Sequence, residues 1–437
     1  MVHHKILKIL FTLLLCIIVL FYDEYKALGS FYFYTLTLWG IFDIIKKKKI
    51  ELIHVWNAAF GFIILSEVFS EKFNTSQLSV VALQFLIIAN NVIYIGYVSC
   101  DKSFKNKIEN SKEGIINYNP KKITPYIIIM LVFFFFFFKI SSAIASISVG
   151  RVGQSEEESF ILGSIVNALG FILPALIAYY FVIINKKKIL LAVLIASPIF
   201  IIEFLIGTRF PLLFSVLGFV IVVLGKFSIK GINLKTSFFI ILSISVLLFG
   251  SKAMQNFRAQ GFMSNNTNDL IQENYNSIPA SVLSLGSPEG VVDMTGLMFN
   301  YFERHNFMYG KSSSFILYFW VPRSIWPDKP TMLGHWLIRE YRYGFSSGHS
   351  SSFGFTGELY SDFGFFSLIF VFFVGRLIAK ANDFKNKALK SNSYQLVLGA
   401  MLFPYIFFFV RSPVTATINF IAILFFYFLF KKMFVIK

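Results

Sequence analysis

Residue types able to do chemistry concentrate between Tyr301 and Gly364, in a chain that is otherwise rich in Phe, Ile and Leu. Two short runs stand out within this stretch, one at 322–330 with Arg, Trp and Lys and one at 357–364 with Glu and Tyr. Arginine stays charged and donates two parallel hydrogen bonds to a phosphate or carboxylate, whereas His and Glu transfer protons. The stretch therefore predicts a site for an anionic substrate.

The composition indicates that a membrane holds this stretch. Of 437 residues, 56% are hydrophobic and 14% charged, which is more apolar material than a soluble core of this size can bury. The formal charge of +17 does not indicate nucleic-acid binding, because the lysines form short clusters between apolar runs rather than a basic face. Cys16 and Cys100 give neither a disulfide framework nor the spacing of metal ligands.

Apolar windows long enough to cross a bilayer as tilted helices recur along the chain. They predict an all-α polytopic membrane protein with about twelve transmembrane helices. Nine are expected in 1–250 and three in 363–437, with one large external loop, 251–362, between them. The windows are 6–22, 27–45, 51–69, 78–98, 126–149, 160–184, 189–206, 211–225, 236–250, 363–379, 394–411 and 414–430.

Lysine clusters give the expected orientation, because basic residues that flank spans resist translocation and stay in the cytoplasm. With the N-terminus inside, lysines fall in alternate turns and after the last window. This alternation predicts that both termini are cytoplasmic and that the loop 251–362 is external. The clusters lie at 46–49, 102–122, 186–188, 226–235, 380–390 and 431–432.

Arginine shows the opposite distribution. Eight of the nine arginines fall on or near the expected outer face, and only Arg376 lies at the cytoplasmic end of a window. Membrane topology alone favours neither Lys nor Arg on the outer face. The arginines there therefore indicate a chemical requirement for the guanidinium group. Arg209 is the sharpest case, since it lies in the short turn 207–210 at the mouth of a helical bundle. Pairing with acidic residues and anchoring at lipid headgroups are the alternatives.

The middle of the large loop, Ser312–Trp326, is apolar and aromatic but is interrupted by Pro322 and Arg323. This pattern predicts an interfacial or re-entrant helix, or an ordinary amphipathic helix resting on the membrane. The earlier part of the loop, Met263–Asn276, is rich in Asn and is typical of a polar surface segment.

The Gly-Thr-Arg turn at 207–209, the large outer loop and the two runs together resemble the O-antigen polymerases, also called oligosaccharide repeat unit polymerases. The runs read Pro-Arg-x-x-Trp-Pro-x-Lys-Pro at 322–330 and Gly-Glu-x-Tyr-x-x-Phe-Gly at 357–364. The resemblance implies a membrane glycosyltransferase at the outer leaflet of the bacterial inner membrane. It would transfer a growing glycan from undecaprenyl pyrophosphate to the nonreducing-end hydroxyl of a new lipid-linked repeat unit. The resemblance implies no metal and no other cofactor, and it makes a chain-length regulator protein a candidate partner.

Such a transfer needs a group that stabilises the departing pyrophosphate, a base for the attacking hydroxyl, and groups that hold the sugars. The basic candidates for the pyrophosphate are Arg209 and Arg323, followed by Lys329, Arg304 and Arg411. The candidates for the base, which the sequence does not rank, are Glu358, His305, His335 and His349. The candidates for stacking on sugar rings are Trp326, Trp320 and Tyr360. Glu358 has the alternative of capping a helix, and the tryptophans have that of an interfacial belt.

Two other functions remain open at this stage. An O-antigen ligase would use a lipid A core as acceptor, and only the loop motifs favour the polymerase over it. A transporter or flippase of lipid-linked oligosaccharide should place charged groups along a central cavity. The windows hold few ionisable residues, with exceptions such as Glu67 and Glu203 near window ends, so the transporter is the less favoured alternative.

Overall fold

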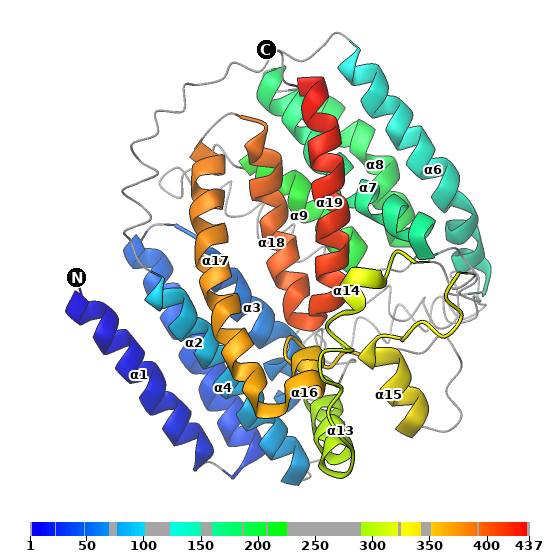
Figure 1. The fold of residues 1–437 in the computed structure, drawn as a ribbon. Helices are drawn as coiled ribbons and strands as arrows, with labels where there is room; N and C mark the ends of the chain where they lie inside the picture. Colours follow the sequence, from blue (N-terminus) through cyan, green and yellow to red (C-terminus); the bar gives the residue numbers. More distant parts are fainter. Residues whose placement is uncertain are drawn as a thin grey trace, which may run out of the picture. The chain divides into compact units, whose positions relative to one another are not determined.

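The computed structural model describes residues 2–21, 23–47, 49–69, 77–100, 123–149, 160–185, 188–206, 209–224, 290–321, 325–341, 351–390 and 393–434. Across these ranges the regular structure is entirely helical (Figure 1). Contacts divide the chain into two units. Unit 1 holds the described residues within 1–114, 286–383 and 406–417, and unit 2 holds those within 115–285, 384–405 and 418–437.

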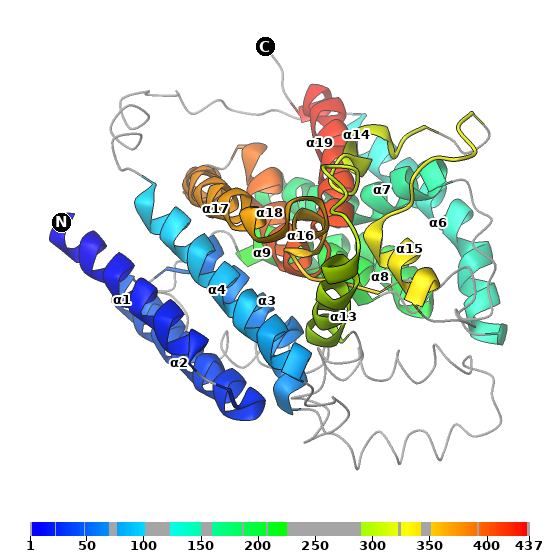
Figure 2. The same ribbon diagram turned by 60° about the horizontal axis from the view of Figure 1, so that its bottom comes forward.

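Unit 1 begins with four long apolar elements. These are α1 (Val2–Leu20), α2 (Tyr25–Lys47), α3 (Leu52–Ile63) with the 3-10 helix Leu65–Phe69, and α4 (Gln77–Ser99). The later elements are α13 (Val291–Arg304), α14 (Phe315–Tyr318), α15 (Leu333–Tyr341), α16 (Gly357–Phe363), the 3-10 helix Gly364–Phe366 and most of α17 (Ser367–Lys390). Helix α4 packs against both α1 and α13 (Figure 2).

Buried polar side chains join α2, α3 and α4 in the interior of unit 1. The indole nitrogen of Trp56 donates to Asn90 over 2.7 Å, and the amide of Asn90 donates to the Tyr32 hydroxyl over 3.0 Å. That hydroxyl in turn donates to Asn91 over 2.6 Å. Since the hydrocarbon region supplies no water for these groups, their mutual bonds fix how the three helices pack.

Helices α4 and α17 pack backbone against backbone. A Cβ added to Gly96 would overlap the carbonyl oxygen of Phe372, and one added to Gly375 would overlap that of Ile93. Small residues permit this close approach between apolar helices. The position of α17, and of α16 directly before it, is therefore fixed by α4.

The helices of the large loop gather at one end of unit 1. Helices α13, α15 and α16 lie at the end where α1 finishes and α2 begins, opposite the lysines that close α2 (Figure 1). The hydroxyl of Ser79, at the start of α4, donates to Asp293 of α13 over 3.2 Å. This is the end that the lysine distribution predicts to be external.

Unit 2 is built from α6 (Thr124–Val149), α7 (Phe160–Ala178) with the π-helical turn Tyr179–Ile184, α8 (Ile189–Leu205), α9 (Arg209–Leu224), and most of α18 (Gln395–Arg411) and α19 (Pro413–Phe434). Helix α7 packs against both α8 and α9 and is largely buried from Val166 onward. Helix α6 exposes Phe133 and Phe137, as expected of a helix that faces lipid.

The helical, polytopic prediction is confirmed. Eleven of the twelve windows coincide with helices, and the window 236–250 lies outside the described residues. In the described part, seven helices are long and apolar enough to cross a membrane by length and composition, and four more apolar helices are shorter. Of the helix predicted over Ser312–Trp326, the described residues 312–321 and 325–326 contain the single turn α14. Pro322 disfavours helical geometry at Val321, the residue before it, so a helix continuing through this point was not favoured.

Candidate functional site

The second sequence run forms α16, and both of its glycines have a structural role. Gly364 has a φ of 57°, and a Cβ there would come within 2.7 Å of the Phe307 ring. A Cβ on Gly357 would overlap that of Phe353. Only glycine satisfies both the positive φ and the close ring at 364. The run 357–364 therefore shapes a tight junction between the loop and α17.

Tyr360 belongs to an aromatic core rather than to an exposed surface. Its side chain is 5% exposed, and its ring contacts those of Phe85, Phe299 and Phe365 at centroid distances between 4.5 and 5.5 Å. This cluster packs α16 against α13 and α4. As the structure stands, the faces of the Tyr360 ring are covered by protein.

Glu358 lies in the first turn of α16 and is buried. Its Oε2 has no hydrogen-bond partner among the described residues. Asp362, one turn further, is also buried, but its carboxylate accepts two backbone N–H groups from Ser312 and Ser313. Of these two acidic residues, Glu358 is thus the one that keeps an uncommitted oxygen.

His305 immediately follows α13 and is exposed. Its ring stacks on Tyr301 with centroids 4.0 Å apart and an angle of 8° between the planes. Its Nδ1 lies 2.9 Å from the carbonyl oxygen of Tyr301. Because a carbonyl oxygen can only accept, we assign the proton to Nδ1, which makes Nε2 the basic nitrogen of the neutral ring. Arg304, beside it at the end of α13, is also exposed.

His335 and Arg411 are connected through the segment 351–354. The backbone nitrogen of Ser351 donates to Gly334, next to His335, over 3.0 Å. The hydroxyl of Ser352 donates to the carbonyl oxygen of Arg411. Trp336 of α15 contacts Tyr301 with ring centroids 5.4 Å apart. These contacts link α13, α15, the segment 351–354 and the end of α18. We call the part of unit 1 that carries Arg304, His305, His335 and Arg411 the loop face.

The first sequence run is described only from residue 325 onward. Lys329 is buried, and its ammonium donates to the carbonyl oxygens of Phe319 and Val321 over 3.0 and 2.8 Å. Trp326 contacts Tyr318 with ring centroids 5.3 Å apart, and Trp320 is 60% exposed. The lysine of the motif therefore holds the backbone that leads into 322–324, while both tryptophans keep accessible surface.

Three predicted residues cannot be placed on the loop face. Arg323 and His349 lie outside the described residues. Arg209 is the first residue of α9 in unit 2, and the structure describes its backbone but not its side chain.

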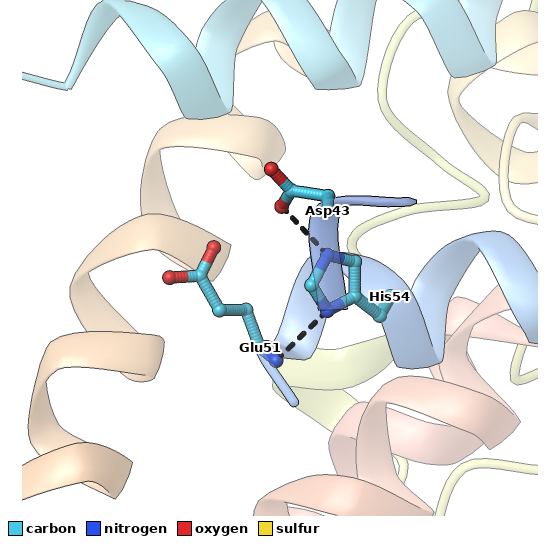
Figure 3. A group of neighbouring side chains, drawn as sticks. All are labelled: Asp43, Glu51 and His54. Carbon is cyan, nitrogen blue, oxygen red and sulfur yellow. Dashed lines mark hydrogen bonds and ion pairs between the residues drawn. The ribbon is translucent and has the colours of Figure 1, made fainter. Parts of the chain in front are cut away.

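One buried ionic cluster was not anticipated from the sequence. Asp43, Glu51 and His54 have ligand-type atoms within 4.8 Å of one another (Figure 3). Lys47 already lies 2.7 Å from both Asp43 Oδ2 and Glu51 Oε2. His54 contacts Asp43 through Nε2 at 2.9 Å, and its Nδ1 accepts the backbone N–H of Glu51 at 3.0 Å (Figure 3). With an ammonium between the carboxylates and both ring nitrogens engaged, the cluster fits an ion-pair network that joins α2 to α3 better than a metal site.

The family model described as O-antigen polysaccharide polymerase Wzy matches residues 4–436, which is nearly the whole chain. Comparison with curated proteins and with solved structures gave no match.

Proposed function

Because the chain belongs to the O-antigen polysaccharide polymerase Wzy family, it is a membrane enzyme that polymerises lipid-linked repeat units, and we propose that His305 is the base of this transfer. Family membership favours polymerisation over the ligase and transporter alternatives. The observation that carries the proposal for His305 is its hydrogen bond to the Tyr301 carbonyl oxygen, which makes Nε2 the basic nitrogen of an exposed ring.

The other three candidates for the base are less well suited. Glu358 is buried, with 9% of its surface exposed. His335 is half-buried on α15, and His349 lies outside the described residues. A general base must come within hydrogen-bond reach of the hydroxyl that it deprotonates. Exposure and tautomer together favour His305.

In the proposed reaction, the nonreducing-end hydroxyl of a lipid-linked repeat unit attacks the anomeric carbon of the donor glycan. The bond between that carbon and the oxygen of undecaprenyl pyrophosphate breaks, and the hydroxyl proton moves to Nε2 of His305. The pyrophosphate leaves with increased negative charge, which guanidinium groups stabilise best in a site that is already organised. Arg304 directly precedes His305, and we include Arg411, whose backbone carbonyl oxygen accepts a hydrogen bond from Ser352, in the same group. Arg209 and Arg323 remain proposed members of this group on sequence grounds.

The lysine distribution supports an orientation in which the loop face is external and both termini are cytoplasmic. In a bacterial inner membrane, this arrangement gives the loop face access to lipid-linked glycans in the outer leaflet. Within the loop face, we assign Lys329 to holding the chain at 319–321 and the accessible rings of Trp320 and Trp326 to contacts with sugars.

The test is complementation of a strain from which the encoding gene is deleted, followed by gel analysis of its surface polysaccharide. The deletion should leave cores capped by a single repeat unit, whereas a complete absence of capped cores would point to a ligase. Wild type and Asn306→Ala, an exposed neighbour, should restore long chains. His305→Ala and His305→Gln should not, at equal protein level in the membrane. A normal ladder with either His305 variant would exclude His305 as the base.

A further inference from the structure

Glu67 is a buried carboxylate whose position the proposed chemistry does not explain. It lies in the 3-10 helix that follows α3 and is 0% exposed. Burying an ionised carboxylate is costly unless hydrogen-bond donors surround it. A glutamate at such a position therefore requires specific partners.

The partners of Glu67 are the first two residues of α13. Its Oε1 accepts the backbone N–H of Val291 over 2.5 Å, and its Oε2 accepts that of Val292 over 2.9 Å. The first N–H groups of a helix have no acceptor within the helix, and the helix dipole favours negative charge at this end. Glu67 thus supplies α13 with hydrogen-bond acceptors and a negative charge, although it precedes this helix by more than 220 residues.

Helix α13 also packs against α4, in addition to its contacts with α15 and α16. Asp293 accepts a hydrogen bond from Ser79, Phe299 packs on Phe85 with ring centroids 5.4 Å apart, and Gly296 lies against Leu78. Helix α13 has 14 residues, which corresponds to a length of about 20 Å. Glu67 holds one end of this helix, and Arg304 and His305 lie at the other. A tilt at the Glu67 end therefore moves the two site residues.

We propose that Glu67 is a positioning residue for polymerisation, which fixes α13 so that His305 and Arg304 face the reacting groups. The inference rests on the proposed role of His305. Displacing a catalytic group by about 1 Å can cost about a hundredfold in rate. Glu67→Gln keeps the shape but replaces one oxygen by an NH₂ group, which then faces a backbone N–H and cannot accept from it.

The first measurement is polymerisation by the full chain in membrane vesicles supplied with lipid-linked repeat units. Glu67→Gln should lower kcat by about 10- to 100-fold while KM changes by less than about threefold, because the arginines outside α13 still bind the donor. The matched control is Glu24→Gln, which removes an exposed carboxylate at the same end of unit 1 and should leave kcat unchanged. An unchanged kcat for Glu67→Gln would overturn the proposal.

The second measurement restores the position of α13 without Glu67. A Cβ on Gly296 would lie 3.6 Å from that of Leu78, a separation that suits a disulfide. In a chain with Cys16 and Cys100 replaced by Ser, Leu78→Cys and Gly296→Cys should form this bond on oxidation, as seen by gel mobility before and after reduction. Oxidation should return most of the kcat lost in Glu67→Gln, and reduction should remove it again.

A disulfide that forms without restoring kcat would overturn the positioning role. Disulfide formation, seen by gel mobility, reports directly on the packing of α13 against α4. This result therefore does not depend on the role of His305. Conversely, active His305 variants would refute the proposed base and leave the measured effect of Glu67 on α13 intact.

Discussion

The carboxylate of Asp362 accepts the backbone N–H of Ser312 through Oδ1, 2.9 Å away, and that of Ser313 through Oδ2, 2.7 Å away. These bonds tie the segment after His305 to α16. Asp362→Ala should leave two N–H groups without acceptors and destabilise the protein by on the order of 2 kcal/mol. Thermal unfolding in detergent measures the loss, and Asp328→Ala, at an exposed site, is the control. Equal melting temperatures for the two variants would show that the tie contributes nothing.

A substitution of Lys329 can distinguish a structural role of this residue from a role in substrate binding. Lys329→Met keeps the aliphatic stem but leaves the carbonyl oxygens of Phe319 and Val321 without their donor. We expect a lower melting temperature, corresponding to about 1–3 kcal/mol, together with reduced chain extension. Lys311→Met, at an exposed position, should change neither. Loss of chain extension at an unchanged melting temperature would instead make Lys329 a ligand of the pyrophosphate.

The arginines Arg209 and Arg323 are predicted to bind the departing pyrophosphate. Replacing either with Ala, and also with Lys, should abolish chain extension at normal protein level, because lysine lacks the planar fork that donates two parallel hydrogen bonds. Gel analysis of polysaccharide length gives the result. Arg376→Ala, at the exposed surface of α17, should retain long chains. Unchanged chain length in the Arg209 or Arg323 variants would remove that residue from the site.

The sequence predicted the parts of the fold that depend on local composition, since apolar windows mark helices whatever their partners. It did not predict α13, whose apolar residues alternate with Asp, Thr, Asn and Glu and become buried only against α4. Glu67 was visible as an ionisable exception, but its partners Val291 and Val292 are distant in sequence. The same limit applied to the choice of base, because the tautomer of His305 depends on the Tyr301 carbonyl oxygen.

The predicted orientation of the chain in the membrane can be tested with two exposed lysines, one in the large loop and one in α17. Lys311 lies in the loop, and Lys387 lies in the last turns of α17. If the loop is external, Lys311→Cys should react with an impermeant thiol reagent in intact spheroplasts, whereas Lys387→Cys should react only after lysis. Replacement of Cys16 and Cys100 by Ser removes the background. The opposite labelling pattern would reverse the orientation inferred from the lysines.

Glu51, in the turn between α2 and α3, gives the ionic cluster a measurable dependence on pH. Burial raises the pKa of its carboxyl, but the hydrogen bonds and charges of Lys47 and Lys49 outweigh this effect and hold the pKa at about 2, against an ordinary 4.5. A lowered pKa in the folded state stabilises the protein above the unfolded value and loses that effect as pH falls towards the folded value.

We therefore expect Glu51→Gln to be less stable than wild type by on the order of 2 kcal/mol at pH 7. The difference should shrink as pH falls from about 4.5 towards 2, the ordinary and shifted pKa values of this carboxyl. Melting temperatures of both proteins in detergent across this range provide the measurement, with Glu24→Gln as the exposed control. A difference that stayed constant down to the lowest pH would mean that the charge of Glu51 does not hold α2 to α3.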